Sequence, residues 1–126
     1  MDAFNALTPE RRVSLLLPFV NDNRVATLRS VLSRRTRRVT LALENIYHSQ
    51  NASAVVRSCE CFGIQDVTVI ENSSRFLASN GVARGAFKWL TYHRFGSESF
   101  NTPAAYADLR RRGYTIVAAS PHPGHD

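Results

Sequence analysis

Two short apolar segments with a helical segment between them constrain the fold of this chain more than any other feature. Residues 39–43 (Val-Thr-Leu-Ala-Leu) and 66–70 (Asp-Val-Thr-Val-Ile) are apolar and rich in β-branched side chains, and they predict buried strands. Between them, residues 51–62 carry apolar side chains at helical spacing, and Gly63 follows as a residue that commonly ends a helix. This order indicates a βαβ unit with parallel strands and a right-handed crossover.

The rest of the chain continues the alternation. Residues 89–95 predict a third strand, and Asn101-Thr102-Pro103 begins a helix that ends at Gly113. Residues 114–119 (Tyr-Thr-Ile-Val-Ala-Ala) then predict a fourth strand. We therefore expect residues 39–126 to form an α/β domain, a parallel sheet with flanking helices.

The residues before the first strand predict helices. Thr-Pro-Glu at residues 8–10 combines a capping side chain, a first-turn proline and an acidic group, and it begins a helix that runs to about Leu17. A second helix fits residues 22–34, where apolar side chains recur at helical spacing. We assign residues 1–38 to an N-terminal helical segment.

Length and hydropathy exclude some classes of protein. The chain has 126 residues, 44% of them hydrophobic, which suits one compact domain with a core. No apolar run approaches the roughly 18 residues that a membrane span requires. The start, Met1-Asp2-Ala3-Phe4, lacks the basic and apolar regions of a secretory signal. We expect a cytoplasmic protein without a membrane partner.

The positive charge is carried almost entirely by arginine. The net charge is +6, and Lys88 is the only lysine. Arginine donates in a planar fork that suits phosphate, so the composition favours a nucleic-acid partner, although high-GC codon usage produces the same bias. The basic run at residues 34–38 fits a solvated interdomain loop and a phosphate contact equally well.

The cysteines and histidines predict no metal site. Cys59 and Cys61 are two positions apart, whereas zinc sites use C-x₂-C with a second pair of ligands. Two helical residues at this spacing do not face each other, so we expect two reduced structural thiols rather than a disulfide. The four histidines show no ligand spacing.

The segment Asn51-Ala52-Ser53-Ala54-Val55-Val56-Arg57-Ser58 is the most informative in the chain. If Asn51 caps a helix, one side of that helix is apolar and packs on the sheet. Arg57 then lies nearly opposite, among small residues that leave room for a partner to approach. The apolar side comprises Ala52, Val55, Val56, Cys59 and Phe62, and the small residues are Ser53, Ala54, Ser58 and Cys61.

Physical chemistry alone gives these two polar residues ordinary roles. Arg57 is three positions before Glu60, and such a surface pair contributes only a few tenths of a kcal/mol. Asn51 is a preferred helix cap and needs no further role.

A family resemblance favours functional roles for Arg57 and Asn51 over these ordinary ones. Residues 51–58, followed by Phe62-Gly63 and the strand at 67–70, resemble the first signature motif of SpoU/TrmH RNA methyltransferases. That motif has Asn, a small residue, Ser-Ala, two aliphatic residues, and Arg with Ser or Thr. The resemblance continues in residues 83–90 and 113–120 and covers about Val39 to Ser120.

The resemblance implies a SPOUT fold, in which the C-terminal part of a parallel α/β sheet threads into a trefoil knot. It implies a homodimer that binds S-adenosylmethionine in the knot and methylates a ribose 2′-oxygen of tRNA or rRNA. Arg57 matches the catalytic arginine of the first motif, and Asn51 matches its motif partner. Ala119, Ser120 and Pro121 match the first edge of the methyl-donor site.

The chain departs from the family pattern after Ser120. The second motif, a glycine-rich loop with an acidic residue, and the third, a Ser/Leu/Asn segment at the knot, are not in this sequence. We therefore expect an incomplete SPOUT domain that lacks the knot region and most of the S-adenosylmethionine site, and that is inactive alone. The alternative is a non-catalytic RNA-binding or dimerisation module.

Contacts with RNA phosphates are expected from scattered basic residues. Residues 110–112 are weaker candidates, because positive charge is favourable at a helix C-terminus for electrostatic reasons alone. A nucleotide-binding α/β domain is disfavoured, since residues 44–51 contain no glycine and so no G-x-G-x-x-G turn. The expected RNA-binding residues are Arg34, Arg35, Arg37, Arg38, Arg84 and Lys88.

Overall fold

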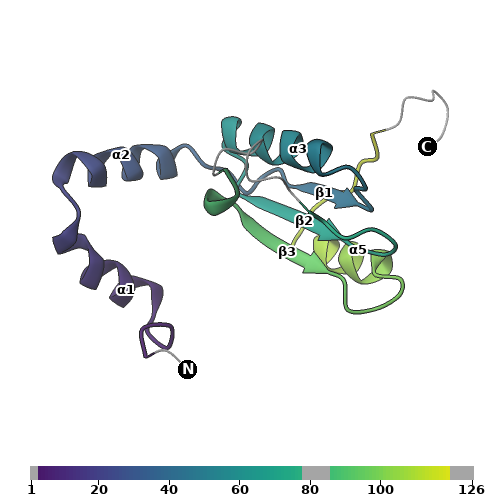
Figure 1. Cartoon of the computed structure of the whole chain (residues 1–126), viewed down its shortest axis with the longest axis horizontal. Coiled ribbons are helices and arrows are strands. Elements are labelled where there is room, and N and C mark those ends of the chain that lie inside the picture. Colours follow the sequence, from purple (N-terminus) through teal and green to yellow (C-terminus); the bar gives the residue numbers. More distant parts are fainter. Residues whose placement is uncertain (1–2, 78–85, 120–126) are drawn as a thin grey trace. The chain divides into compact units, whose positions relative to one another are not determined.

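A computed structural model describes residues 3–77 and 86–119 and divides the chain into two compact units, Met1–Arg35 and Thr36–Asp126 (Figure 1). Each unit is described by itself. The first is helical and the second contains the sheet.

The N-terminal unit contains α1 (Pro9–Leu16), η1 (Leu17–Phe19) and α2 (Asp22–Ser33). The Thr8 hydroxyl accepts the N–H of Arg11 at 3.3 Å, so the predicted cap is confirmed. α1 ends at Leu16, close to the predicted end at about Leu17, and Pro18 lies in the short η1 that follows. None of these helices buries a residue, and among the described residues no helix has the length and hydropathy needed to cross a membrane.

The second unit is a three-stranded parallel sheet with helices on its two faces, in the strand order β1-β2-β3. The predicted βαβ unit and its parallel pairing are confirmed. Gly63 and Gly113 have φ values of 72° and 88°, the left-handed conformation expected after a helix. The elements are β1 (Leu41–Glu44), α3 (Ser49–Cys61), β2 (Asp66–Ile70), η2 (Ala86–Trp89), β3 (Thr91–Phe95) and α5 (Thr102–Arg111).

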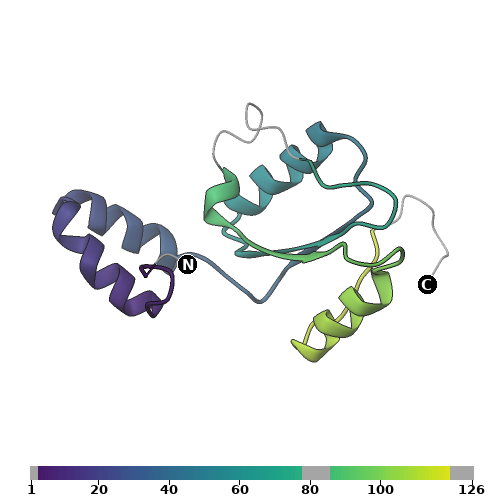
Figure 2. The same cartoon turned by 60° about the horizontal axis from the view of Figure 1, so that its bottom comes forward.

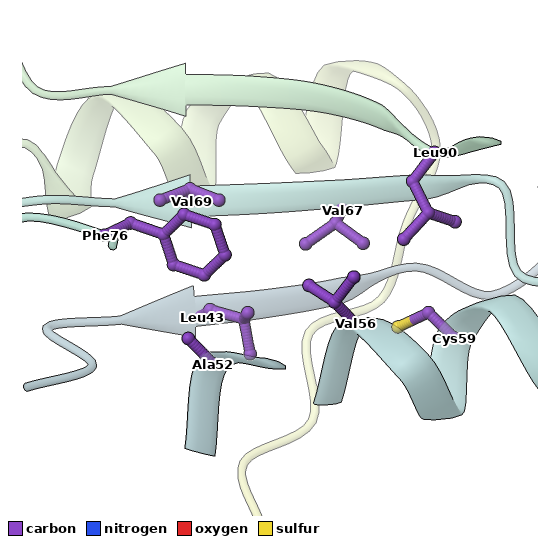
Figure 3. Packing of buried hydrophobic residues seen from close by; sticks show 8 residues of the cluster. All are labelled: Leu43, Ala52, Val56, Cys59, Val67, Val69, Phe76 and Leu90. Atoms are coloured by element: carbon purple, nitrogen blue, oxygen red, sulfur yellow. The ribbon is translucent and has the colours of Figure 1, made fainter. Parts of the chain in front are cut away.

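Successive side chains of the central strand, β2, point to opposite faces of the sheet. Val67 and Val69 pack with α3 in an apolar core, whose labelled side chains Figure 3 shows between strands and helix. Asp66 and Thr68 point to the other face because side chains alternate along a strand. Figure 2 shows α3 above the sheet and α5 below it.

The predicted fourth strand is wrong. Residues 114–119 have no strand assignment, and a groove of about 640 Å³ is lined by residues 113–117 on one side and residues 38–42 on the other. A strand requires backbone hydrogen bonds to a neighbouring strand, and the groove separates residues 113–117 from residues 38–42, so no ladder forms between them. The segment is apolar as described, but an apolar pattern alone does not predict whether a segment pairs with a neighbouring strand.

Candidate functional site

Arg57 projects from α3 into solvent. The residues that α3 buries are Ala52, Ser53, Val56 and Cys59, whereas Arg57 is exposed. Arg57 forms no hydrogen bond or ion pair with any residue in the described part of the chain, so the expected pairing with Glu60 is not observed. The guanidinium is available to a ligand.

The predicted surroundings of Arg57 are partly wrong. Ser53, placed on the open side by the sequence, is fully buried, and its hydroxyl donates to the carbonyl of Ser49 at 2.7 Å. Phe62, placed against the sheet, is 80% exposed. Because Ser53 is one turn before Arg57, Arg57 emerges at the border of the packed side rather than opposite it.

Asn51 does not cap the helix. The N-cap is His48, whose side chain makes no capping hydrogen bond, and α3 begins at Ser49. Asn51 is an exposed residue of the first turn. Its separation of six positions from Arg57 corresponds to about 120° around the helix, so the two predicted catalytic side chains do not lie on one side.

A clamp that sequence reasoning missed holds the loop between β1 and α3. Asn45 has φ of 50°, and its side-chain oxygen accepts the backbone N–H groups of Asn72 at 3.0 Å, Ser73 at 2.9 Å and Ser74 at 3.4 Å. This one oxygen fixes the loop after β2 to the loop that leads into α3. Asparagine tolerates the left-handed conformation better than most residues, and this preference is the signal by which the sequence could have indicated a turn at Asn45.

Further polar side chains join the same end of the sheet to α5. The Glu44 carboxylate accepts the Thr102 hydroxyl at 2.5 Å and the Asn72 amide at 3.3 Å. Asn101 is buried, and its amide donates to the carbonyl of Glu71 at 2.7 Å. The carboxyl ends of parallel strands are where α/β proteins bind ligands, and here that edge is held by side-chain hydrogen bonds.

A cavity of about 620 Å³ opens beside this network, lined by residues 71–77, Arg94, Gly96 and Glu98. Glu71 accepts the N–H of Phe76 at 2.7 Å and pairs with Arg94 at 2.9 Å. Burial alone would raise the pKa of Glu71, but the hydrogen bond from Phe76 and the Arg94 guanidinium outweigh it and lower that pKa below its ordinary value.

Comparison with known proteins now decides the family. The model of the SpoU rRNA Methylase family matches residues 38–126, which include α3 and Arg57. This chain belongs to the SpoU family. The matched range includes residues 51–58, which resemble the first signature motif of the family.

The relatives of this SpoU chain are RNA-modifying enzymes. A tRNA (guanosine(18)-2'-O)-methyltransferase of Borreliella burgdorferi is 35% identical over 90% of this chain and 50% of its own length. The enzyme of the same name from Thermus thermophilus is 28% identical over 74% of this chain and 46% of its own length. The chain thus spans about half the length of the curated relatives it matches.

The structural comparison supports the SpoU fold. The crystal structure of the Aquifex aeolicus TrmH/SpoU tRNA modifying enzyme matches with a TM-score of 0.60 at 23% identity, over 73% of this chain and 45% of that chain. The three-stranded sheet and its flanking helices are therefore a partial SpoU domain.

The residues expected at the donor site of the SpoU family are only partly described. Ala119 is exposed and lines the groove of about 640 Å³ beside β1, together with Val117 and Ile116. Ser120 and Pro121 lie outside the described residues. Ala119, the described member of this set, therefore lies at a groove with a mainly apolar lining.

The expected RNA-binding residues of this SpoU chain are dispersed. Arg34 belongs to the helical unit and donates to the carbonyl of Ser30 at 3.2 Å, and Arg35 ends that unit. Arg38 and Lys88 are exposed in the second unit, and Arg84 lies outside the described residues.

Arg37 differs from the other candidates because it pairs with buried Asp66 at 2.9 Å. Within the described ranges, no cluster of three or more His, Cys, Asp and Glu residues is arranged to hold a metal ion. Cys59 is buried in the core, where desolvation raises the pKa of its thiol, and Cys61 is exposed; both are free thiols.

Proposed function

We propose that the protein carrying this chain is an RNA 2′-O-ribose methyltransferase that transfers a methyl group from S-adenosylmethionine to tRNA. The observation that carries the proposal is the exposed, unpaired guanidinium of Arg57 within the first SpoU motif. The relatives' names support tRNA as the substrate. We further propose a homodimer acting in the cytoplasm.

Arg57 acts as a positioning and charge-stabilising group. A ribose hydroxyl is a weak nucleophile until its proton leaves, and a guanidinium with a pKa above about 12 stays protonated and cannot take that proton. A protonated fork instead binds the phosphate beside the target ribose and stabilises the negative charge that develops on the 2′-oxygen. The exposure of Arg57 and its lack of a partner support this role.

Asn51 acts separately from Arg57. Its amide is exposed in the first turn of α3, where it offers both a donor and an acceptor to a ligand. Because the two side chains point to different sides of the helix, Asn51 contacts another part of the substrate or of the protein.

The described residues fit one edge of a donor site. Apolar Ile116, Val117 and Ala119 line the groove beside β1, which suits contact with the flat, largely apolar adenine ring of S-adenosylmethionine. This molecule supplies an activated methyl group on a sulfonium.

The test is methyl transfer by the chain together with any coding sequence that follows Asp126 in its reading frame. We expect radiolabelled methyl groups in an unmodified tRNA transcript, recovered as a 2′-O-methylated nucleoside after digestion. Label on a base, or no label with RNA and donor both bound, contradicts the proposal. A calorimetric titration with S-adenosylmethionine that shows no heat supports the alternative, a non-catalytic RNA-binding or dimerisation module.

A further inference from the structure

A second polar site lies at the amino-terminal end of the sheet, on the face that α5 covers. A cavity of about 350 Å³ is lined there by Arg37, Asp66, His93, Arg112 and Tyr114. The geometry points to a binding site for a backbone phosphate of RNA, held by Arg37 and Arg112. The choice of RNA rests on the proposed function.

Buried Asp66 organises one side of this cavity. Its side chain is 5% exposed, and its two oxygens pair separately with Arg37 Nε at 2.9 Å and His93 Nε2 at 3.1 Å. Because Arg37 uses Nε for Asp66, its two terminal amino groups have no partner among the described residues. The carboxylate therefore fixes the direction of a fork whose outer donors remain free, which favours a planar oxyanion ligand.

Arg112 and Tyr114 build the other side. The Tyr114 hydroxyl donates to the carbonyl of Arg37 at 2.6 Å, although the two residues are 77 positions apart. The Arg112 guanidinium lies 5.1 Å from the centre of the Tyr114 ring, and only its NH1 group contacts Asp108, at 3.3 Å. Stacking on the ring holds this guanidinium in place and leaves its other N–H donors available to a ligand.

The charges around the cavity favour the binding of an anion. Two guanidinium groups face it against one carboxylate, and that carboxylate is already paired. The side chain of Arg37 is 67% exposed, so a large ligand can reach it. A phosphate bound between two arginines satisfies donors that the described residues leave free.

This site is remote from Arg57. Asp66 begins β2 on the α5 face, whereas α3 covers the opposite face of the sheet (Figure 2). A small substrate bound by Arg57 does not extend around the sheet, but a folded RNA is large enough to do so. Phosphate contacts far from the reacting group fix the register and orientation of a nucleic acid.

The test measures binding of a fluorescent, unmodified tRNA transcript to the full chain over a range of salt concentrations. Two variants each remove one arginine: Arg112→Gln, and Arg37→Gln combined with Asp66→Asn. The second keeps the net charge and leaves no unpaired buried carboxylate. The control, Arg24→Gln with Arg29→Gln, removes two exposed arginines of α2. Circular dichroism confirms folding of every variant.

We expect each cavity variant to weaken tRNA binding about fivefold at about 0.15 M salt and to reduce the slope of log affinity against log salt by about one. The control changes neither quantity by as much. Cavity variants that bind tRNA like the parent chain overturn the site but leave methyl transfer, which is measured separately, untouched.

A second arm distinguishes RNA from a small phosphate ligand. Inorganic phosphate and a nucleoside monophosphate are titrated while the NMR signals of His93 and Tyr114 are followed. If either shifts these signals at micromolar concentration while the cavity variants retain full tRNA affinity, the site belongs to a small ligand and the RNA assignment is wrong. Shifts only at millimolar phosphate, with weakened tRNA binding in the variants, support it.

Discussion

The two faces of the sheet differ in what they bury. On the face covered by α3, Val67 and Val69 meet Val56 and Cys59 in a core without charged groups. On the face covered by α5, the same strand buries Asp66 and Thr68 beside the apolar Ile70. One strand, with all five residues buried, therefore supplies an apolar core on one face and a mixed polar and apolar layer on the other.

The difference shows how each face affects the stability of the domain. Burial of aliphatic side chains contributes about 25 cal/mol per Å² of apolar surface, whereas a buried hydroxyl or carboxylate costs free energy unless it is paired. Asp66 is paired, but the Thr68 hydroxyl has no hydrogen-bond partner among the described residues. The α3 face thus stabilises the domain through apolar burial, whereas the α5 face combines apolar Ile70 with Asp66 and Thr68, two polar residues whose retention stability alone does not explain.

Isosteric exchanges at neighbouring positions test this contrast. Val67→Thr places an unpaired hydroxyl in the dry core and should lower the free energy of unfolding by about 1–3 kcal/mol. Thr68→Val removes a hydroxyl that already lacks a partner, so stability should change by less than about 0.5 kcal/mol or increase. Urea unfolding of both variants measures the difference. Equal losses would show that the faces are energetically alike.

The clamp at the carboxyl end of the sheet should show a smaller effect. Asn45→Gly keeps the left-handed backbone without strain but removes the acceptor for three N–H groups, and it should cost about 1–2 kcal/mol. Asn45→Asp retains the acceptor and serves as the matched control. Hydrogen exchange at Asn72, Ser73 and Ser74 should accelerate in the glycine variant only; unchanged exchange there would refute the clamp.

The ion pair at the edge of the α3 face should give the smallest effect, and it depends on pH. Because the pKa of Glu71 is lowered in the folded state, its contribution is present above the unfolded pKa and is lost as pH falls through the folded pKa. The stability advantage of the parent chain over Glu71→Gln should be under about 1 kcal/mol at about pH 7 and should disappear as the pH is lowered through the folded pKa. An advantage that is constant over this range would rule out the carboxylate as its source.

The fold was predictable where a segment carries its own signal. The apolar, β-branched run at residues 66–70 predicted β2 with its correct bounds, and Gly63 and Gly113 marked helix ends. Residues 114–119 have a similar apolar pattern, yet they form no strand. Strand pairing depends on a neighbouring strand, and the sequence of the segment itself does not specify that neighbour.

The site was predictable only in part, for a similar reason. The motif made Arg57 a candidate, and helical spacing correctly placed it on an exposed side of the helix. Spacing could not resolve whether Ser53 or Phe62 is buried, since both flank the apolar stripe. Helical spacing also could not predict that Arg112 and Arg37 line the same cavity, because their proximity depends on how α5 packs against the sheet.

The role of Arg57 is tested most directly by the steady-state kinetics of Arg57→Lys in the protein that carries methyl-transfer activity. Lysine keeps the charge but loses the planar fork, so kcat should fall about 100-fold or more. Arg24→Lys, an exchange on the exposed surface of α2, should leave kcat unchanged. An Arg57→Lys protein that methylates tRNA at the parent rate would contradict the account.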